Sequence, residues 1–184
     1  MKKQRLFLLA ATLLMGFGSF AQDGPSHGLR AGWSAAGLYA NGNQVDDSQQ
    51  SFYVGTFRTD QVKSILHWYK GLEYQQMGRR ENDNNYRTLH YLSLPQAARL
   101  KIGPVFAQVG IAFNIKVGES LVKDGYDTKT DATKAEWYDF PWHVGLGLKL
   151  GPVTVDARRY WGLNDITDLG YRNQYFQIGA GISF

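Results

Sequence analysis

The sequence predicts an all-β fold, an eight-stranded antiparallel up-and-down transmembrane β-barrel. Eight segments alternate between apolar and polar residues, which is the period of a β-strand with two unlike faces. The connections between these segments run long, short, long, short, long, short and long. The apolar faces carry almost no ionisable side chains, as expected for strands whose outer face meets lipid.

The eight predicted strands are separated by polar loops or by short turns, two of which are the Gly-Pro pairs at 103–104 and 151–152. The alternation is clearest in the fifth strand, where every second residue from Val105 to Val117 is apolar. In the second strand two sets of apolar residues compete for the outer face, so its facing stays open. The predicted strands span about residues 28–39, 51–59, 64–77, 88–102, 105–117, 137–150, 153–163 and 174–184.

The last eleven residues, 174–184, form the predicted closing strand, which would pair with the strand that begins near Gly28. One of its faces is polar or small apart from Tyr175, and the other face is apolar throughout. The apolar face consists of Phe176, Ile178, Ala180, Ile182 and Phe184.

Three residues depart from the barrel pattern. Pro95 lies within the fourth strand, and a closed ladder has no free edge for a missing N–H, so we expect a bulge near it. Lys70 and Arg159 fall on the outward face, where a cation at the centre of the bilayer costs roughly 2–4 kcal/mol. The barrel interpretation therefore requires both cations to lie near a membrane boundary, or the strand register to slip by a bulge.

Charged side chains also fall on the polar faces, which must line the lumen. An eight-stranded barrel has a narrow interior that side chains fill, so the pattern does not predict a water-filled porin. We expect Glu73 and Asp156 to bond with arginines, because buried charges must be paired or hydrated. We interpret the charges as a structural network, with a proton or ion path as the alternative. The predicted network is Arg30, Glu73, Arg99, Lys149, Asp156 and Arg158, with Lys101 and Lys116 also facing the lumen.

Residues 1–21 have the features of a secretory signal peptide. Basic residues open the chain, residues 6–18 are mostly apolar, and small residues precede the expected cleavage between Ala21 and Gln22. The apolar stretch is too short for a transmembrane helix, which needs about 20 residues. The sequence thus predicts export, with residues 22–184 as the barrel domain.

Composition excludes several classes of function. The chain has 184 residues, 20 basic and 16 acidic, and removal of the signal peptide leaves an almost neutral domain without a nucleic-acid footprint. The absence of cysteine excludes disulfides, thiolate catalysis and cysteine metal sites. No motif indicates a cofactor or a catalytic metal.

Several short motifs carry a family resemblance over about residues 28–184. They are Gly28-Leu29-Arg30-Ala31-Gly32, the run from Leu72 to Gly78, the run from Tyr91 to Pro95, and the segment from Arg158 to Ile166. Together they resemble the outer-membrane β-barrel domain family of the PorT kind, often described as porin-like. The resemblance implies an integral protein in the outer membrane of a diderm bacterium, and some members of the family are tied to protein secretion. It supplies no catalytic residues.

We expect a non-enzymatic barrel whose external loops, 78–87 and 118–136, contact a partner or whose role is structural. A lipid-acting enzyme is an alternative, although the four histidines are scattered along the chain without an accompanying serine motif. A small-solute pore is another alternative. A soluble ligand-binding barrel would need an apolar interior, contrary to the pattern. The expected partners are outer-membrane lipid and, through the last strand, the barrel-assembly machinery, with no nucleic acid.

The terminal Phe184 resembles the end signal by which outer-membrane barrels are recognised for assembly. We predict that deletion of Phe184 impairs membrane insertion more than it changes the finished fold. The amount of barrel that reaches the cell surface measures this effect, and normal surface levels after the deletion would contradict the prediction.

Overall fold

A computed structural model describes residues 26–40, 43–44, 47–82, 85–123, 126–127, 136–165 and 172–184. The predicted signal peptide and its cleavage site between Ala21 and Gln22 lie outside the described residues, as do parts of several loops. Within the described ranges, no helix is long and apolar enough to cross a membrane.

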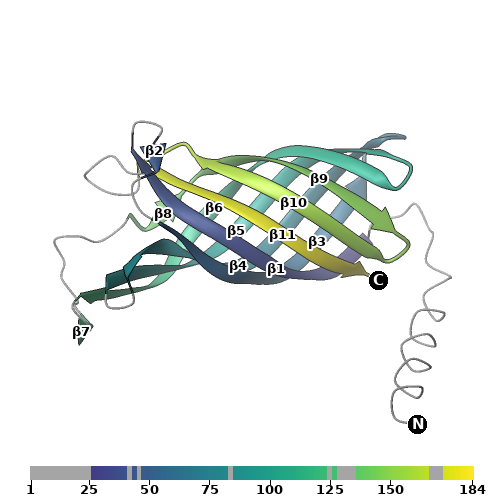
Figure 1. The fold of residues 1–184 in the computed structure, drawn as a ribbon. Coiled ribbons are helices and arrows are strands. Elements are labelled where there is room, and N and C mark those ends of the chain that lie inside the picture. The colour runs from purple at the N-terminus through teal and green to yellow at the C-terminus, as the bar shows by residue number, and fades with distance from the viewer. Residues whose placement is uncertain are drawn as a thin grey trace, which may run out of the picture.

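Eight long antiparallel strands form a closed barrel, as the sequence predicts (Figure 1). Three two-residue strands extend the connections at the loop end: β2 (Asn43–Gln44), β7 (Tyr126–Asp127) and β8 (Tyr138–Asp139). The long strands are β1 (Ser26–Ala40), β3 (Asp47–Gln61), β4 (Leu66–Asn82), β5 (Asn85–Ile102), β6 (Val105–Lys123), β9 (Pro141–Leu150), β10 (Val153–Gly162) and β11 (Arg172–Ser183).

The first and last strands close the sheet. Strand β1 pairs with β11 in one unbroken register, from Gly28 opposite Ser183 to Tyr39 opposite Arg172. The N–H of Phe184 then donates to the carbonyl of His27 at 2.9 Å, which continues the pairing to the end of the chain. The sheet therefore has no free edge along this join, as a strand fold in lipid requires.

Strands β4, β5 and β6 extend beyond the limits that the alternation of apolar and polar residues predicts. Strand β4 reaches Asn82 and β6 reaches Lys123, so both enter segments that the sequence predicts as loops. Residues 79–82 pair with residues 85–87, and residues 118–122 pair with residues 86–90. Figure 1 shows this extension reaching beyond the neighbouring strands at the loop end. Backbone ladder hydrogen bonds hold these polar segments, and such bonds leave no apolar period in the sequence.

The prediction of a bulge near Pro95 is wrong. The register between β4 and β5 is the same on both sides of this residue. The register between β5 and β6 shifts between His90 and Tyr91, where the extra residue, Val117, belongs to β6. The proline ring packs over Gly71, where an added Cβ would approach Pro95 Cγ to 2.9 Å. The ring fits without a bulge because the neighbouring strand has a glycine at this position.

The structure settles which way the second long strand, β3, faces. Phe52 and Val54 are about half exposed on the outer surface, whereas Tyr53 and Phe57 are buried in the lumen. The tyrosine hydroxyl accounts for this choice, because Tyr53 accepts a hydrogen bond from Arg30 Nη2 at 2.6 Å inside the barrel. An apolar ring with a polar tip suits the lumen better than lipid.

Lys70 and Arg159, which the sequence predicts on the outward face, lie towards opposite ends of the barrel. Lys70 is four residues from the start of β4 at the short-turn end, and its Nζ lies 3.3 Å from Asp60 Oδ2. Arg159 lies three residues from the end of β10 at the loop end, where its Nη2 donates to Gln174 Oε1 at 3.1 Å. Both positions keep the charge away from the middle of the wall, as the barrel interpretation requires.

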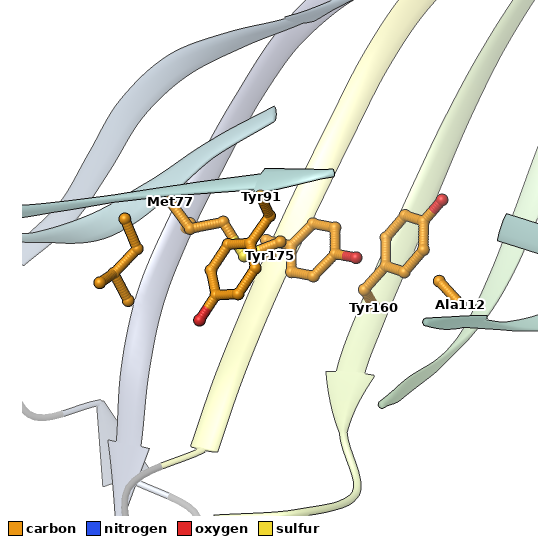
Figure 2. Close-up of a cluster of buried hydrophobic side chains, with 7 residues drawn as sticks. Met77, Tyr91, Ala112, Tyr160 and Tyr175 are labelled. Atoms are coloured by element: carbon orange, nitrogen blue, oxygen red, sulfur yellow. The ribbon is translucent and has the colours of Figure 1, made fainter. Parts of the chain in front are cut away.

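The loop-side part of the lumen contains a buried cluster that is mostly apolar and aromatic. Its centre is the stacked pair Tyr160 and Tyr175, whose ring centroids lie 4.2 Å apart at an interplanar angle of 11°. Figure 2 shows the labelled side chains in a row across the barrel. The lumen is therefore filled, although not by polar groups alone. The cluster consists of Ala36, Met77, Leu89, Tyr91, Ala112, Tyr160 and Tyr175.

We predict that Gly179→Val destabilises the barrel. A Cβ at this position would overlap the hydroxyl of Tyr53 and lie 2.7 Å from the carbonyl of Ala31, so the lumen cannot accept it. Overpacking of this kind costs typically 1–3 kcal/mol in free energy of unfolding, measured by urea titration in lipid vesicles. The matched control is Ala180→Val, which places the same side chain one residue away on the exposed outer face. Equal stability of the two variants would contradict the prediction.

Candidate functional site

Four charged side chains meet at one level of the lumen. They are Arg30 from β1, Glu73 from β4, and Asp156 and Arg158 from β10, and all four are buried. Each points inward because alternate residues of a strand face the same side. Arg30 lies 126 residues from Asp156 in the sequence, so only the closed barrel brings the two together.

Glycines on the neighbouring strands leave room for these long side chains. Gly55 lies between Arg30 and Glu73 in the register of β1, β3 and β4, and an added Cβ there would approach Glu73 Cγ to 2.8 Å. Gly147 and Gly179 flank Asp156 from β9 and β11, and a Cβ on Gly147 would lie 2.7 Å from Asp156 Cβ. The inward glycines of the sequence thus surround its inward charges.

The four groups form a closed ring of ion pairs, called here the lumen ring. Arg30 contacts both acids: its Nη1 lies 2.6 Å from Glu73 Oε1 and its Nη2 lies 3.1 Å from Asp156 Oδ1. Arg158 also contacts both, through Nη1 to Glu73 Oε1 at 3.2 Å and through Nε to Asp156 Oδ2 at 2.5 Å. Two cations face two anions, so the lumen ring is neutral, with each charge between two partners of opposite sign.

Three tyrosines add hydrogen bonds to the lumen ring, and none of them belongs to the network that the sequence predicts. Tyr53 accepts a bond from Arg30, and Tyr69 donates to Glu73 Oε1 at 3.1 Å. Arg158 Nη1 lies 3.5 Å from the hydroxyl of Tyr160, and its guanidinium also stacks 4.5 Å from the ring centroid of Tyr69. The spacing along the strands could have indicated two of them. Tyr69 is four residues from Glu73 and Tyr160 is two residues from Arg158, so each tyrosine faces the lumen with its charged neighbour.

Two predicted members of the network lie apart from the lumen ring. Arg99 is buried, but its Nε and Nη2 donate to Gln108 Oε1 at 3.1 and 2.9 Å. Its guanidinium also lies over the rings of Tyr69 and Phe106, at 4.7 and 4.0 Å from their centroids. An amide and two aromatic faces therefore solvate this charge. Lys149 is half-buried and lies opposite Thr154, nearer the short-turn end than Asp156.

The four histidines occupy separate environments. His143 is buried in the lumen, where its ring packs 4.6 Å from that of Tyr160. His90 lies on the outer wall, with Nδ1 2.7 Å from the hydroxyl of Tyr74. His27 and His67 lie towards the short-turn end. Among the described residues, no group of three or more His, Cys, Asp or Glu side chains could hold a metal ion.

A family of known proteins shares the sequence features of this barrel. The sequence matches the family described as outer membrane protein beta-barrel domain over residues 20–168. The chain belongs to this outer-membrane barrel family. No curated protein matches the sequence significantly.

Solved barrels share the fold of this family member at low sequence identity. Neisserial surface protein A superposes with a TM-score of 0.59 at 12% identity, over 88% of this chain and 99% of that one. Ail, the attachment invasion locus protein of Yersinia pestis, gives a TM-score of 0.57 at 13% identity, over 88% and 99% of the two chains. OprG from Pseudomonas aeruginosa gives 0.50 at 11% identity, over 88% and 96%. These structures support the closed eight-stranded barrel.

We predict that Asp156→Arg abolishes the heat-resistant folded form of the barrel. The substitution would place a third cation against Arg30 and Arg158 and leave Glu73 as the single acid of the lumen ring. Removing one partner of a buried ion pair lowers the free energy of unfolding by about 3–5 kcal/mol, and charge reversal adds repulsion. Gel mobility of unboiled and heated samples measures the loss.

The matched control is Asp165→Arg, which reverses an exposed acid paired with Arg172 at 2.8 Å. Water screens this pair, so we expect its gel behaviour to stay close to that of the unmodified protein. Unchanged heat resistance of Asp156→Arg would show that the lumen ring does not hold the barrel together.

Proposed function

We propose that the protein is a non-enzymatic integral barrel of the outer membrane that acts through its loop-side extension. Strands β4, β5 and β6 have 17, 18 and 19 residues, whereas β9, β10 and β11 have 10, 10 and 12. One side of the barrel therefore rises above the other as an ordered platform. Rigid scaffolds that present such a platform commonly serve binding.

A second observation supports a binding role, because polar contacts fix the extension internally. Glu119 accepts a hydrogen bond from Arg87 Nε at 2.7 Å, and its other carboxylate oxygen lies 2.7 Å from Lys116 Nζ. Close by, Trp137 is 60% exposed, with its ring centroid 4.8 Å from that of Tyr138. Exposed aromatic side chains on an ordered support are typical of protein-binding surfaces.

Catalysis and conduction receive less support from the geometry. The lumen ring and the buried cluster around Tyr160 and Tyr175 occupy the lumen, so we expect no steady current in planar bilayers. His90 and His143 lie on opposite faces of the wall and contact Tyr74 and Tyr160, without a serine among these partners. We therefore expect an unchanged lipid A profile when the protein is overproduced.

We propose that residues 1–21 are removed after Ala21, that the barrel resides in the outer membrane of a diderm bacterium, and that Phe184 engages the barrel-assembly machinery. The resemblance to the PorT kind extends the proposal to a role in envelope assembly or secretion. The exposed side chain of Phe184 at the end of β11 is compatible with recognition of this strand.

We predict that a photoreactive residue at Ser120 gives a discrete cross-linked adduct in intact cells. Ser120 is exposed on the extension, opposite Thr88 of β5. The matched control is the same substitution at Val62, which is 57% exposed at the short-turn end. Immunoblots compare the two positions, and mass spectrometry identifies the adduct.

The proposed function fails if Ser120 gives no adduct beyond those obtained at Val62. A steady current through the purified barrel would favour a pore instead, and an altered lipid A profile would favour an enzyme.

A further inference from the structure

A hollow of about 340 Å³ lies at the short-turn end of the barrel, bordered by β1, β3, β4 and Phe184. The side chains that shape it belong to two adjacent outward rows of the sheet, and most of them are exposed. They are His27, Leu29, Thr56, Arg58, Lys70 and Leu72.

The strand register places the apolar and the basic side chains of the hollow in two separate rows. Leu29, Thr56 and Leu72 lie side by side on β1, β3 and β4, and the small threonine between two leucines leaves the space. The next row towards the rim carries His27, Arg58 and Lys70 in the same order of strands. An apolar row thus borders a row of basic side chains.

The row of basic side chains keeps a positive charge despite its internal ion pairs. Asp60 accepts from Arg58 Nε at 2.6 Å and lies 3.3 Å from Lys70 Nζ, so one carboxylate serves two cations. Both cations remain about half exposed. The contact through Nε leaves the two terminal nitrogens of Arg58 as donors for an acceptor in the hollow.

The same end of the barrel is basic on its inner side as well. Lys101 and Lys149 lie at the inward positions of β5 and β9 next to the two Gly-Pro turns, and Lys63 lies in the turn between β3 and β4. Cations near a membrane surface attract anionic headgroups. The hollow differs from this general charge because it joins its cations to an apolar recess.

We propose that the hollow binds one anionic phospholipid of the adjacent leaflet. The phosphate accepts hydrogen bonds from Arg58 and Lys70, and the start of an acyl chain lies in the recess between Leu29 and Leu72. The wall continues deeper into the membrane with Ala31 and Val54, so the chain meets apolar surface beyond the hollow. This inference depends on insertion in a membrane and not on a partner at the loop-side extension.

The proposal is tested by counting the lipids that remain bound to the barrel. The protein is reconstituted in nanodiscs of equal parts phosphatidylglycerol and phosphatidylcholine, and native mass spectrometry measures the lipids retained after release. We expect one retained phosphatidylglycerol in preference to phosphatidylcholine. The double variant Arg58→Gln/Lys70→Gln should lower this retention at least about tenfold, because each cation near an anionic headgroup contributes.

Two further variants separate a built site from general charge. Lys63→Gln removes a cation from the same end of the barrel but outside the hollow, and its retention should match that of the unmodified protein. Thr56→Trp fills the recess on the outer face without changing the charge, and it should lose the bound lipid. Heat-shifted gel mobility confirms that each variant is folded.

Equal retention of the two lipids would overturn the proposal, as would equal losses in Lys63→Gln and in the double variant. Full retention of phosphatidylglycerol by Thr56→Trp would also overturn it, because the row of basic side chains would then hold the lipid without the recess. Cross-linking from Ser120 should be the same in all these variants, so failure of this proposal is distinguishable from failure of the proposed function.

Discussion

The pairing of β1 with β11 turns eight strands into a closed wall, and the radius of that wall constrains the interior. Within lipid, every backbone N–H and C=O must find a partner in the sheet, which a closed ladder provides. Closure with eight strands leaves an interior that side chains fill. The inward faces of this chain therefore alternate between glycine and large polar or aromatic residues. Gly55, Gly147 and Gly179 face the space that the lumen ring and Tyr53 occupy.

The same confinement explains how the charges are arranged. A narrow lumen offers little water, so a carboxylate or guanidinium there needs partners of its own. Glu73 and Asp156 each lie between the same two arginines. Tyrosine hydroxyls add hydrogen bonds to Glu73 and to both arginines. Arg99 shows a second solution, with one amide oxygen and two aromatic rings around the guanidinium. Charged side chains on the outer wall, such as Lys70 and Arg159, lie instead towards the ends of the barrel.

The sequence predicts those features that depend on alternation, and it fails where other forces decide. Strand number, closure and the inward position of Arg30 follow from a period of two. The continuation of β4 to Asn82 does not, because polar residues held by ladder bonds carry no apolar signal. Pro95 misleads for a related reason, since its neighbour Gly71 in space accommodates the ring without a bulge. Local pattern does not report which strand lies alongside.

The candidate site shows the same division. Parity places Glu73, Asp156 and Arg158 in the lumen, but the level at which they meet depends on strand register and barrel shear. Strand register and shear separate Lys149 from the lumen ring and place Tyr53 against Arg30, one of its members. Two competing apolar sets left the facing of Tyr53 open in the sequence, and its contact with Arg30 becomes visible in three dimensions only.

The lumen ring couples strands far apart in the chain, and a double-mutant cycle on Arg30 and Asp156 measures this coupling. Free energies of unfolding are measured in lipid vesicles for Arg30→Gln, Asp156→Asn and the double variant. Contact between the two charges predicts a coupling of about 1–3 kcal/mol, so that the double variant loses less than the sum of the single losses. Additive losses would show that Arg30 and Asp156 do not stabilise the barrel through their contact.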